Sequence, residues 1–199
     1  MSPTQILEIE DIEKHFGGLA ALDGVNAHVE SGKLTAIIGA NGAGKTTLFN
    51  VITGILPPSA GRVKFLGQDI TNKPVHEISK LGLARTLQIK SVFNGMTVRE
   101  NLWIAAQSRD GVFKPFQRAS ASSRANQVAD QLCEELGLTQ FANQEAANLS
   151  YGDIALLEIG IALATEPKLL LLDEPICGMG PAETEQTVEK IRNLAKRID

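Results

Sequence analysis

Apolar and polar residues alternate in three runs near the N-terminus of the chain. The runs are 6–16 (ILEIEDIEKHF), 20–29 (AALDGVNAHV) and 62–70 (RVKFLGQDI). Alternation with a period of two is typical of strands that bury one face. Glycine and aspartate favour turns, so we expect turns near Asp23–Gly24 and at Gly61. These runs predict an antiparallel β-layer.

The pattern changes to helical spacing from residue 98 onwards. The segments 98–108 (VRENLWIAAQS) and 122–138 (SSRANQVADQLCEELGL) repeat their apolar residues every three to four positions, as helices do. Between them, 111–116 (GVFKPF) has the composition of a loop. We therefore predict a helical insertion of two or three helices.

An α/β pattern surrounds this insertion on both sides. Upstream, the apolar run 34–38 (LTAII) predicts a strand, and apolar residues return at helical spacing in 46–55. Downstream, we predict a helix over 151–165, a buried strand over 168–174 (KLLLLDE) with a wholly apolar run of leucines, and an amphipathic helix over 181–198. Wholly apolar strands are typical of parallel sheets that are covered on both faces.

Composition and charge exclude several classes of protein. With 199 residues, 43% hydrophobic and 21% charged, the chain has the make-up of one soluble globular domain, which excludes disordered and fibrous classes. The formal net charge is −4 and no basic block is present, so we expect no nucleic-acid partner and no direct contact with an anionic membrane surface. No apolar segment is long enough to span a bilayer, so we expect membrane association only through another protein.

The two cysteines favour neither a metal site nor a disulfide framework. Cys133 and Cys177 are far apart, without CxxC spacing or a histidine cluster. A reducing cytoplasm suits this pattern. For Cys177 we favour a small buried thiol over a redox switch, because no charged activator is adjacent.

A glycine-rich loop, 39–46 (GANGAGKT), lies between the predicted strand and the following helix. Its glycines, at 39, 42 and 44, allow tight turns that expose backbone N–H groups to an anionic phosphate at the helix N-terminus. Lys45 would reach the β- and γ-phosphates, Thr46 would ligate the Mg²⁺ that bridges them, and Thr47 would contact the α-phosphate. The alternative is a glycine-rich turn that only caps a helix.

Two further groups of polar residues follow. Asp173 and Glu174 come at the end of the apolar strand. Asp173 would hold Mg²⁺, and Glu174 would polarise a water molecule for attack on the γ-phosphorus. The alternative is that the two residues only cap the end of a strand. Ser150 and Gly152, within 149–153 (LSYGD), offer a second anion site at a helix N-terminus, and an ordinary N-cap is the alternative.

The order of these motifs resembles the ABC transporter ATPase family over essentially the whole chain. A phosphate loop precedes Gln88, then LSYGD, which corresponds to the family signature LSGGQ, and then LLLLDEP. The resemblance implies an α/β fold: a P-loop NTPase core with a mainly parallel sheet, an N-terminal antiparallel β-layer and a helical insertion. The core would comprise 1–88 and 149–199, the helical subdomain 89–148.

The resemblance also implies roles for individual residues. The residues that would bind ATP are Phe16, Gly39, Asn41, Gly42, Ala43, Gly44, Lys45, Thr46 and Thr47. Phe16 would stack on adenine, and a core phenylalanine is the alternative. Those that would contact ATP held by a second ATP-binding subunit are Ser150, Tyr151 and Gly152. The expected metal residues are Thr46, Gln88 and Asp173, and the expected catalytic residues are Glu174, Gln88 and Lys45.

Within the family, HFGGLAALDGV, ARTLQ, MTVRENL, LSYGD and GMGPAET look most like the ATPases of branched-chain amino acid importers. An ATPase of lipopolysaccharide export is the competing alternative, and a nucleotide-binding module with little turnover is another. The resemblance implies a homo- or heterodimer, transmembrane permease subunits as partners, and a peripheral position on the cytoplasmic face of the inner membrane. It also implies ATP and Mg²⁺ as ligands.

Three features depart from the family pattern. Family members carry a switch histidine after one more strand, whereas this chain ends at Asp199, so we expect slow or absent hydrolysis. Gly180 stands where the family carries Asp or Asn, which removes a side chain that would bond across the dimer. The third departure is an apolar signature helix, which is either buried or a sticky surface; its conspicuous residues are Ile154, Ala155, Leu156 and Ile161.

Overall fold

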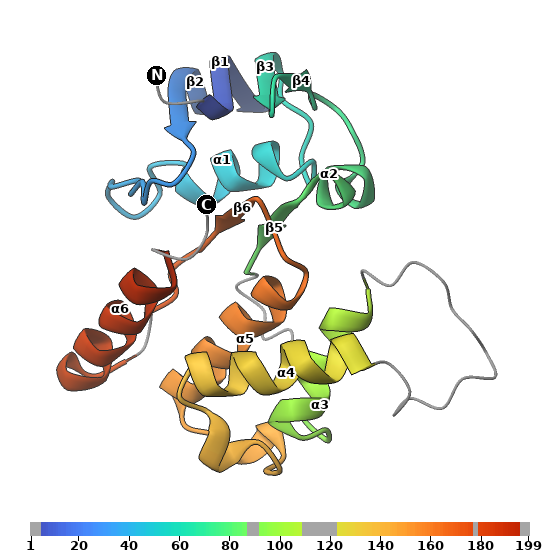
Figure 1. Cartoon of the computed structure of the whole chain (residues 1–199). Coiled ribbons are helices and arrows are strands. Elements are labelled where there is room, and N and C mark those ends of the chain that lie inside the picture. The colour runs from blue at the N-terminus through green and yellow to red at the C-terminus, as the bar shows by residue number, and fades with distance from the viewer. Residues whose placement is uncertain (1–4, 87–91, 109–122, 177–178, 196–199) are drawn as a thin grey trace. The chain divides into compact units, whose positions relative to one another are not determined.

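The computed structural model describes residues 5–86, 92–108, 123–176 and 179–195. The chain divides into two compact units, one of Met1–Leu83 with Ala195–Asp199 and one of Ala84–Leu194. Figure 1 gives the elements of both. The domain limits expected from the sequence stay a prediction.

The first unit is built on a four-stranded antiparallel sheet. The sheet has the order β2-β1-β3-β4, and its strands are β1 (Gln5–Phe16), β2 (Leu19–Glu30), β3 (Ala60–Phe65) and β4 (Gln68–Asp69). Helices α1 (Lys45–Ile52) and α2 (Val75–Leu81) lie on one face of it (Figure 1). The predicted antiparallel β-layer is therefore confirmed.

Both predicted turns in this layer are wrong, because the glycines mark bulges. Gly24 lies inside β2 with φ 65°, where β2 has one residue more than β1 between paired positions. Gly61 lies inside β3 with φ 85°, and a Cβ there would be 2.3 Å from the carbonyl oxygen of Asp11. A bulge, like a turn, often needs a residue that tolerates a positive φ and the close approach of neighbouring backbone. The turn that splits the run 62–70 lies at Gly67, with φ 72°.

The strand predicted over 34–38 is also absent from the structure. These residues are irregular, and the side chains of Leu34 and Ile38 are 65% and 95% exposed. Apolar composition alone does not make a strand, because the backbone N–H and C=O groups of a strand must pair with a neighbour. No strand in the described part of the chain pairs with this run.

In the described ranges, the second unit combines four helices with β6 (Leu169–Leu171) and most of its parallel partner β5 (Leu83–Arg85). As predicted, helices form at α3 (Val98–Gln107), α4 (Ser123–Glu135), α5 (Tyr151–Ala164) and α6 (Pro181–Ala195). Two short 3₁₀ helices, Thr139–Phe141 and Ala146–Asn148, lead from α4 to α5. The predicted loop 111–116 lies outside the described residues.

The apolar signature helix, α5, is buried within its own unit. Ile154 and Leu156 are almost fully covered and belong to the hydrophobic core of that unit. Gly160 makes close packing possible, because a Cβ there would lie 2.5 Å from Cδ1 of Leu136 and 2.8 Å from Cδ2 of Leu102. We expected this helix to be either buried or an exposed apolar surface. For Ile154 and Leu156 the structure confirms burial.

Candidate functional site

The glycine-rich loop adopts the backbone that its sequence predicts. Gly42 and Gly44 have φ values of 82° and 86°, which favour glycine over any other residue. Gly44 is constrained a second time, because a Cβ there would lie 2.5 Å from the carbonyl oxygen of Ala21. Gly39 differs: its φ is not in the left-handed region, but an added Cβ would lie 3.2 Å from Cβ of Ala43. The three glycines therefore provide backbone freedom and space.

Helix α1 opens directly from this loop. Its first intrahelical hydrogen bond runs from the N–H of Leu48 to the carbonyl oxygen of Gly44, at 2.8 Å. The N–H groups of Lys45, Thr46 and Thr47 precede that bond and have no acceptor within the helix. No acidic side chain lies in the first turn. The helix dipole and these N–H groups together favour an anion at this end.

Lys45 lies across the glycine-rich loop. Its Nζ donates to the carbonyl oxygens of Gly39 and Ala40, at 2.7 and 2.9 Å. The loop is also closed by a backbone bond from Ala43 to Ala40, at 3.2 Å, and Asn41 at its tip is exposed. The ammonium group is therefore held at the loop by neutral acceptors, which phosphate oxygens could replace with a gain in charge attraction.

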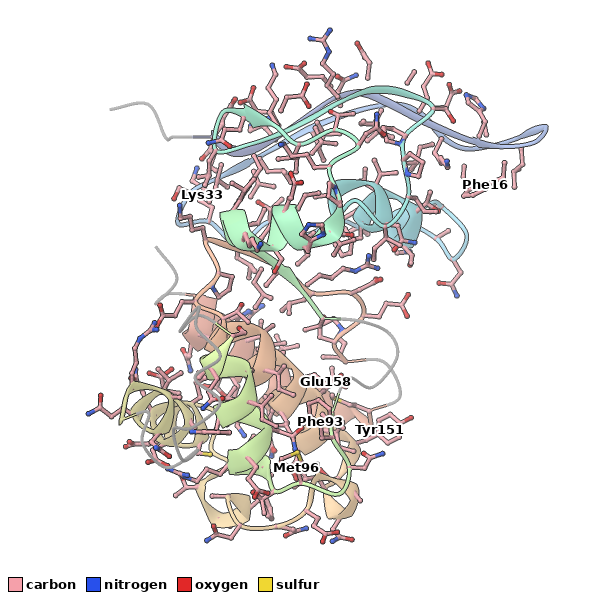
Figure 2. All side chains as sticks on the ribbon, turned by 90° about the vertical axis from the view of Figure 1, so that its right-hand side faces the viewer. Phe16, Lys33, Phe93, Met96, Tyr151 and Glu158 are labelled. Atoms are coloured by element: carbon pink, nitrogen blue, oxygen red, sulfur yellow. The ribbon has the colours of Figure 1, made fainter. Side chains whose placement is uncertain are left out.

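Phe16 is an exposed ring at the end of β1. Its side chain is 48% exposed, and Nζ of Lys14 lies 5.3 Å from the ring centroid. Figure 2 shows it at the tip of the β1–β2 hairpin. The alternative of a core phenylalanine is therefore wrong, whereas stacking on adenine stays a prediction.

In the second unit, Asp173 and Glu174 follow β6 after one intervening residue, Leu172. The predicted strand 168–174 is thus shorter, and both carboxylates stand beyond its end. Asp173 is buried, whereas Glu174 is exposed and has a φ of 50°. A non-glycine residue in this region carries strain on the order of 1 kcal/mol, of the kind that proteins often store at functional sites.

A buried arginine that the sequence analysis did not single out contacts Asp173. Nη2 of Arg85, the last residue of β5, donates to Oδ2 of Asp173 at 2.8 Å. The next residue, Thr86, accepts a hydrogen bond from the N–H of Asp173 at 3.3 Å. The segment 84–88 reads ARTLQ, but nothing in its spacing reveals that it meets a residue 88 positions downstream.

Ser150 is the N-cap of α5, as the simpler alternative predicted. Its Oγ accepts from the N–H of Asp153 at 3.2 Å and donates to Oδ2 of the same residue at 2.7 Å. Gly152 is buried, and Tyr151 is 58% exposed (Figure 2). The hydroxyl of Ser150 is therefore held by Asp153, and its predicted contact with a partner's ATP requires that bond to open.

For three other predicted residues the structure gives few contacts or none. Gln88 and Cys177 lie outside the described residues. Gly180 is exposed, and an added Cβ would have nothing within 4 Å, so its position has room for a side chain. Over the described ranges, no helix is long and apolar enough to cross a membrane.

The oxygen donors present fit Mg²⁺ rather than a softer metal. Thr46 offers a hydroxyl and Asp173 a carboxylate, and both are hard ligands. In the described part of the chain, no group of three or more His, Cys, Asp or Glu residues could cage a metal. Proteins usually hold Mg²⁺ with one or two carboxylates together with substrate phosphates.

Comparison with known proteins identifies the family. The model of the ABC transporter family matches residues 22–177. A high-affinity branched-chain amino acid transport ATP-binding protein, BraF of Pseudomonas aeruginosa, is 40% identical, over 95% of this chain and 76% of that protein. A probable branched-chain amino acid transport ATP-binding protein, LivG of Archaeoglobus fulgidus, is 41% identical over 96% of this chain and 76% of that protein.

Solved structures agree with this assignment. An ATP-binding cassette of an ABC transporter in its ADP conformation matches with a TM-score of 0.86 and 38% identity, over 98% of this chain and 78% of that one. A nucleotide-free cassette matches with a TM-score of 0.84 and 37% identity, over the same shares. The predicted resemblance and the P-loop fold class are thus confirmed, and the chain belongs to the ABC transporter family.

Proposed function

We propose that this chain is the ATP-binding and hydrolysing subunit of an importer of branched-chain amino acids. The observation that carries the proposal is the phosphate loop: Gly42 and Gly44 are left-handed, and Lys45 opens α1 with its ammonium held at the loop. The cargo class rests on the relatives, which are named as branched-chain amino acid transport proteins. Neither of these two relatives is named for lipopolysaccharide export.

The residues of the first unit would bind the nucleotide. Backbone N–H groups of the loop and of the first turn of α1 would hold the phosphates, and Lys45 would leave its carbonyl partners for the β- and γ-phosphates. Thr47 would contact the α-phosphate. Phe16 offers the adenine an exposed aromatic face, which gives affinity with little base discrimination.

The residues of the second unit would carry the chemistry. Glu174 is exposed and would orient the attacking water and accept its proton, while Gln88 would contact the same water. The proposed Mg²⁺ residues are Asp173 and Gln88, together with the hydroxyl of Thr46. When bound, this ion would neutralise charge on the phosphates. The products would be ADP and phosphate.

The proposed partners are a second ATP-binding subunit and transmembrane permease subunits. Ser150, Tyr151 and Gly152 would contact ATP held by the second subunit, once the hydroxyl of Ser150 leaves Asp153. Contact with the membrane would come through the permease alone, which would place the chain on the cytoplasmic face of the inner membrane. ATP would close the dimer, and hydrolysis would reopen it.

A second candidate is a nucleotide-binding module with little turnover. Two observations favour it: the carboxylate of Asp153 holds the hydroxyl that would meet the partner's ATP, and Gly180 offers no side chain to the dimer. Such a module would bind ATP as tightly as an ATPase does. Turnover, not binding, separates the two candidates.

The proposal is tested by replacing Lys45. We expect Lys45→Ala to weaken ATP binding about tenfold or more, because the charge at the phosphate loop is lost. Lys33→Ala is the matched control, since Lys33 lies ahead of the loop and pairs with Glu30. Calorimetric titration with ATP measures both variants. Equal binding by Lys45→Ala and the wild type would contradict the proposed nucleotide site.

The cargo class needs a separate experiment. The chain is expressed with its permease, and ATP-dependent uptake of radiolabelled leucine is compared with uptake of histidine. We expect leucine uptake in the wild type and in Lys33→Ala, and none in Lys45→Ala. ATP turnover without leucine uptake would agree with the proposed ATPase activity and would contradict the proposed cargo class.

A further inference from the structure

A buried ion pair joins the end of β5 to the segment that follows β6. The two strands lie side by side in Figure 1. Nη2 of Arg85 donates to Oδ2 of Asp173 at 2.8 Å, and the two side chains are only 7% and 5% exposed. Burying a carboxylate is costly unless a counter-charge is fixed beside it. Arg85 supplies that charge to the one carboxylate that the proposed function assigns to Mg²⁺.

The same stretch of chain also holds the backbone of Asp173. Thr86 is buried, and its Oγ1 accepts from the N–H of Asp173 at 3.3 Å. Its own N–H donates to the carbonyl oxygen of Leu171 at 3.0 Å. Two adjacent residues therefore fix both the side chain and the main chain of Asp173. Gln88, the other predicted metal residue of this unit, is two positions further along the sequence.

An arginine suits this place better than a lysine would. The guanidinium is planar and always charged, so a buried contact fixes the direction of the carboxylate as well as its charge. The guanidinium of Arg85 donates to Oδ2 of Asp173, which fixes the direction of that oxygen. Residues that hydrogen-bond to a metal-binding side chain usually orient the atom that binds the metal.

We propose that Arg85 is a positioning residue for Mg²⁺-dependent nucleotide binding. Its guanidinium holds the carboxylate of Asp173 in one orientation, while Thr86 holds the backbone of that residue. The inference rests on the proposed role of Asp173 toward Mg²⁺. It assigns to Arg85 and Thr86, which precede Gln88 in the sequence, the task of holding Asp173.

The test measures ATP affinity by calorimetry, once with Mg²⁺ and once with EDTA. The ratio of the two affinities is the Mg²⁺ enhancement, and it does not depend on turnover. Asp173→Asn should abolish the enhancement. Arg85→Lys should lower it about tenfold, the loss typical of residues that orient metal ligands, while affinity in EDTA stays that of the wild type.

A matched control exists in the same unit. Arg99 pairs with Asp130 through two bonds, from Nε to Oδ1 at 2.6 Å and from Nη2 to Oδ2 at 3.0 Å. The pair joins α3 to α4 and is not a candidate for nucleotide contact. Arg99→Lys makes the same chemical change and should leave the Mg²⁺ enhancement at the wild-type value.

The outcomes are separable. A wild-type enhancement in Arg85→Lys, or equal losses in Mg²⁺ and in EDTA, overturns the inference and leaves the proposed function standing. A wild-type enhancement in Asp173→Asn overturns the proposed metal role of Asp173 and the inference with it. An effect of Arg99→Lys equal to that of Arg85→Lys also overturns the inference.

A second variant decides the matter if Arg85→Lys does not fold. Thr86→Val removes only the acceptor for the N–H of Asp173 and keeps the ion pair. A reduced Mg²⁺ enhancement that Thr86→Ser restores supports the inference, because Thr86→Ser keeps the hydroxyl that Thr86→Val lacks. An unchanged enhancement in Thr86→Val overturns it.

Discussion

Gly44 combines a left-handed backbone with close approach of a neighbouring strand. Its φ is 86°, and a Cβ would lie 2.5 Å from the carbonyl oxygen of Ala21 in β2. The backbone of Ala21 cannot move aside as a side chain could. Gly44 therefore fixes both the shape of the phosphate loop and its distance from the sheet.

We expect Gly44→Ala to lower the free energy of unfolding by about 2 kcal/mol and to abolish measurable ATP binding, because strain and overlap both displace the loop. Thermal unfolding and calorimetric titration measure the two effects. Gly18→Ala is the control, since nothing lies within 4 Å of its added Cβ and its φ is not positive. Normal ATP binding by Gly44→Ala would show that the loop does not need this backbone.

At the scale of residues, local chemistry could be predicted and long-range contacts could not. The glycine spacing and Lys45 in 39–46 specify a phosphate loop by themselves, because all parts of that loop are neighbours in sequence. The ion pair of Arg85 with Asp173 joins residues 88 positions apart, and only the fold brings them together. The contact of Ser150 with Asp153 is local by contrast, and the S-x-x-D spacing of a capping box indicates it.

The signature helix α5 owes its position to a glycine on its buried face. Gly160 faces Leu136 and Leu102, both fully buried. An alanine would gain up to about 1 kcal/mol in helix propensity, but overpacking a well-packed core costs about 1–3 kcal/mol. We expect Gly160→Ala to lower the free energy of unfolding by about 1 kcal/mol. Chemical denaturation measures it, with Gly160→Ala/Leu136→Val as the relieving double variant. A stabilised Gly160→Ala would contradict the packing.

The start of α3 predicts a pH dependence of stability. Hydrogen bonds from the backbone and side chain of Thr97 hold the pKa of Glu100 below its usual value, and the hydrogen bond from Arg99 lowers the pKa of Asp130. A carboxylate whose pKa is lower when folded stabilises the fold above its unfolded pKa, and this contribution is lost as the pH falls through the folded pKa.

We therefore expect the free energy of unfolding to fall as the pH drops below about 4, the ordinary carboxyl range. Glu100→Gln and Asp130→Asn should each flatten that decline, and the double variant should flatten it further. Urea unfolding at a series of pH values measures the slopes. Glu134→Gln serves as the comparison, because its carboxyl belongs to neither pair. Slopes in the two single variants as steep as in the wild type would refute the assignment.

At the scale of elements, helices were predictable and strands only in part. The helical periods of 98–108 and 151–165 carry most of the information needed to form α3 and α5. A strand depends on residues far away in sequence: 34–38 is as apolar as β6, yet it is irregular and has no paired strand in the described part of the chain. A glycine at a bulge also cannot be told from a glycine at a turn by sequence alone. Gly24 and Gly61 were predicted at turns for this reason, and both lie at bulges.

At the scale of the whole molecule, family membership was readable from the order of motifs. The phosphate loop, Gln88, LSYGD and LLLLDEP occur in one order over most of the chain, and the ABC transporter family model spans 22–177. What one chain does not encode is the assembly. We propose that a permease sets the cargo pathway and that a second subunit completes the ATP site.

Turnover of Mg²⁺·ATP by the chain and by Glu174→Gln bears most directly on the claim that it is an ATPase. Phosphate release and ATP binding are measured together, with Glu185→Gln as a control that alters an exposed glutamate of α6. We expect release by the wild type and the control, and about a hundredfold less or none from Glu174→Gln with ATP still bound, because the group that orients the water is gone. Binding without release in all three proteins would contradict the ATPase and favour the nucleotide-binding module.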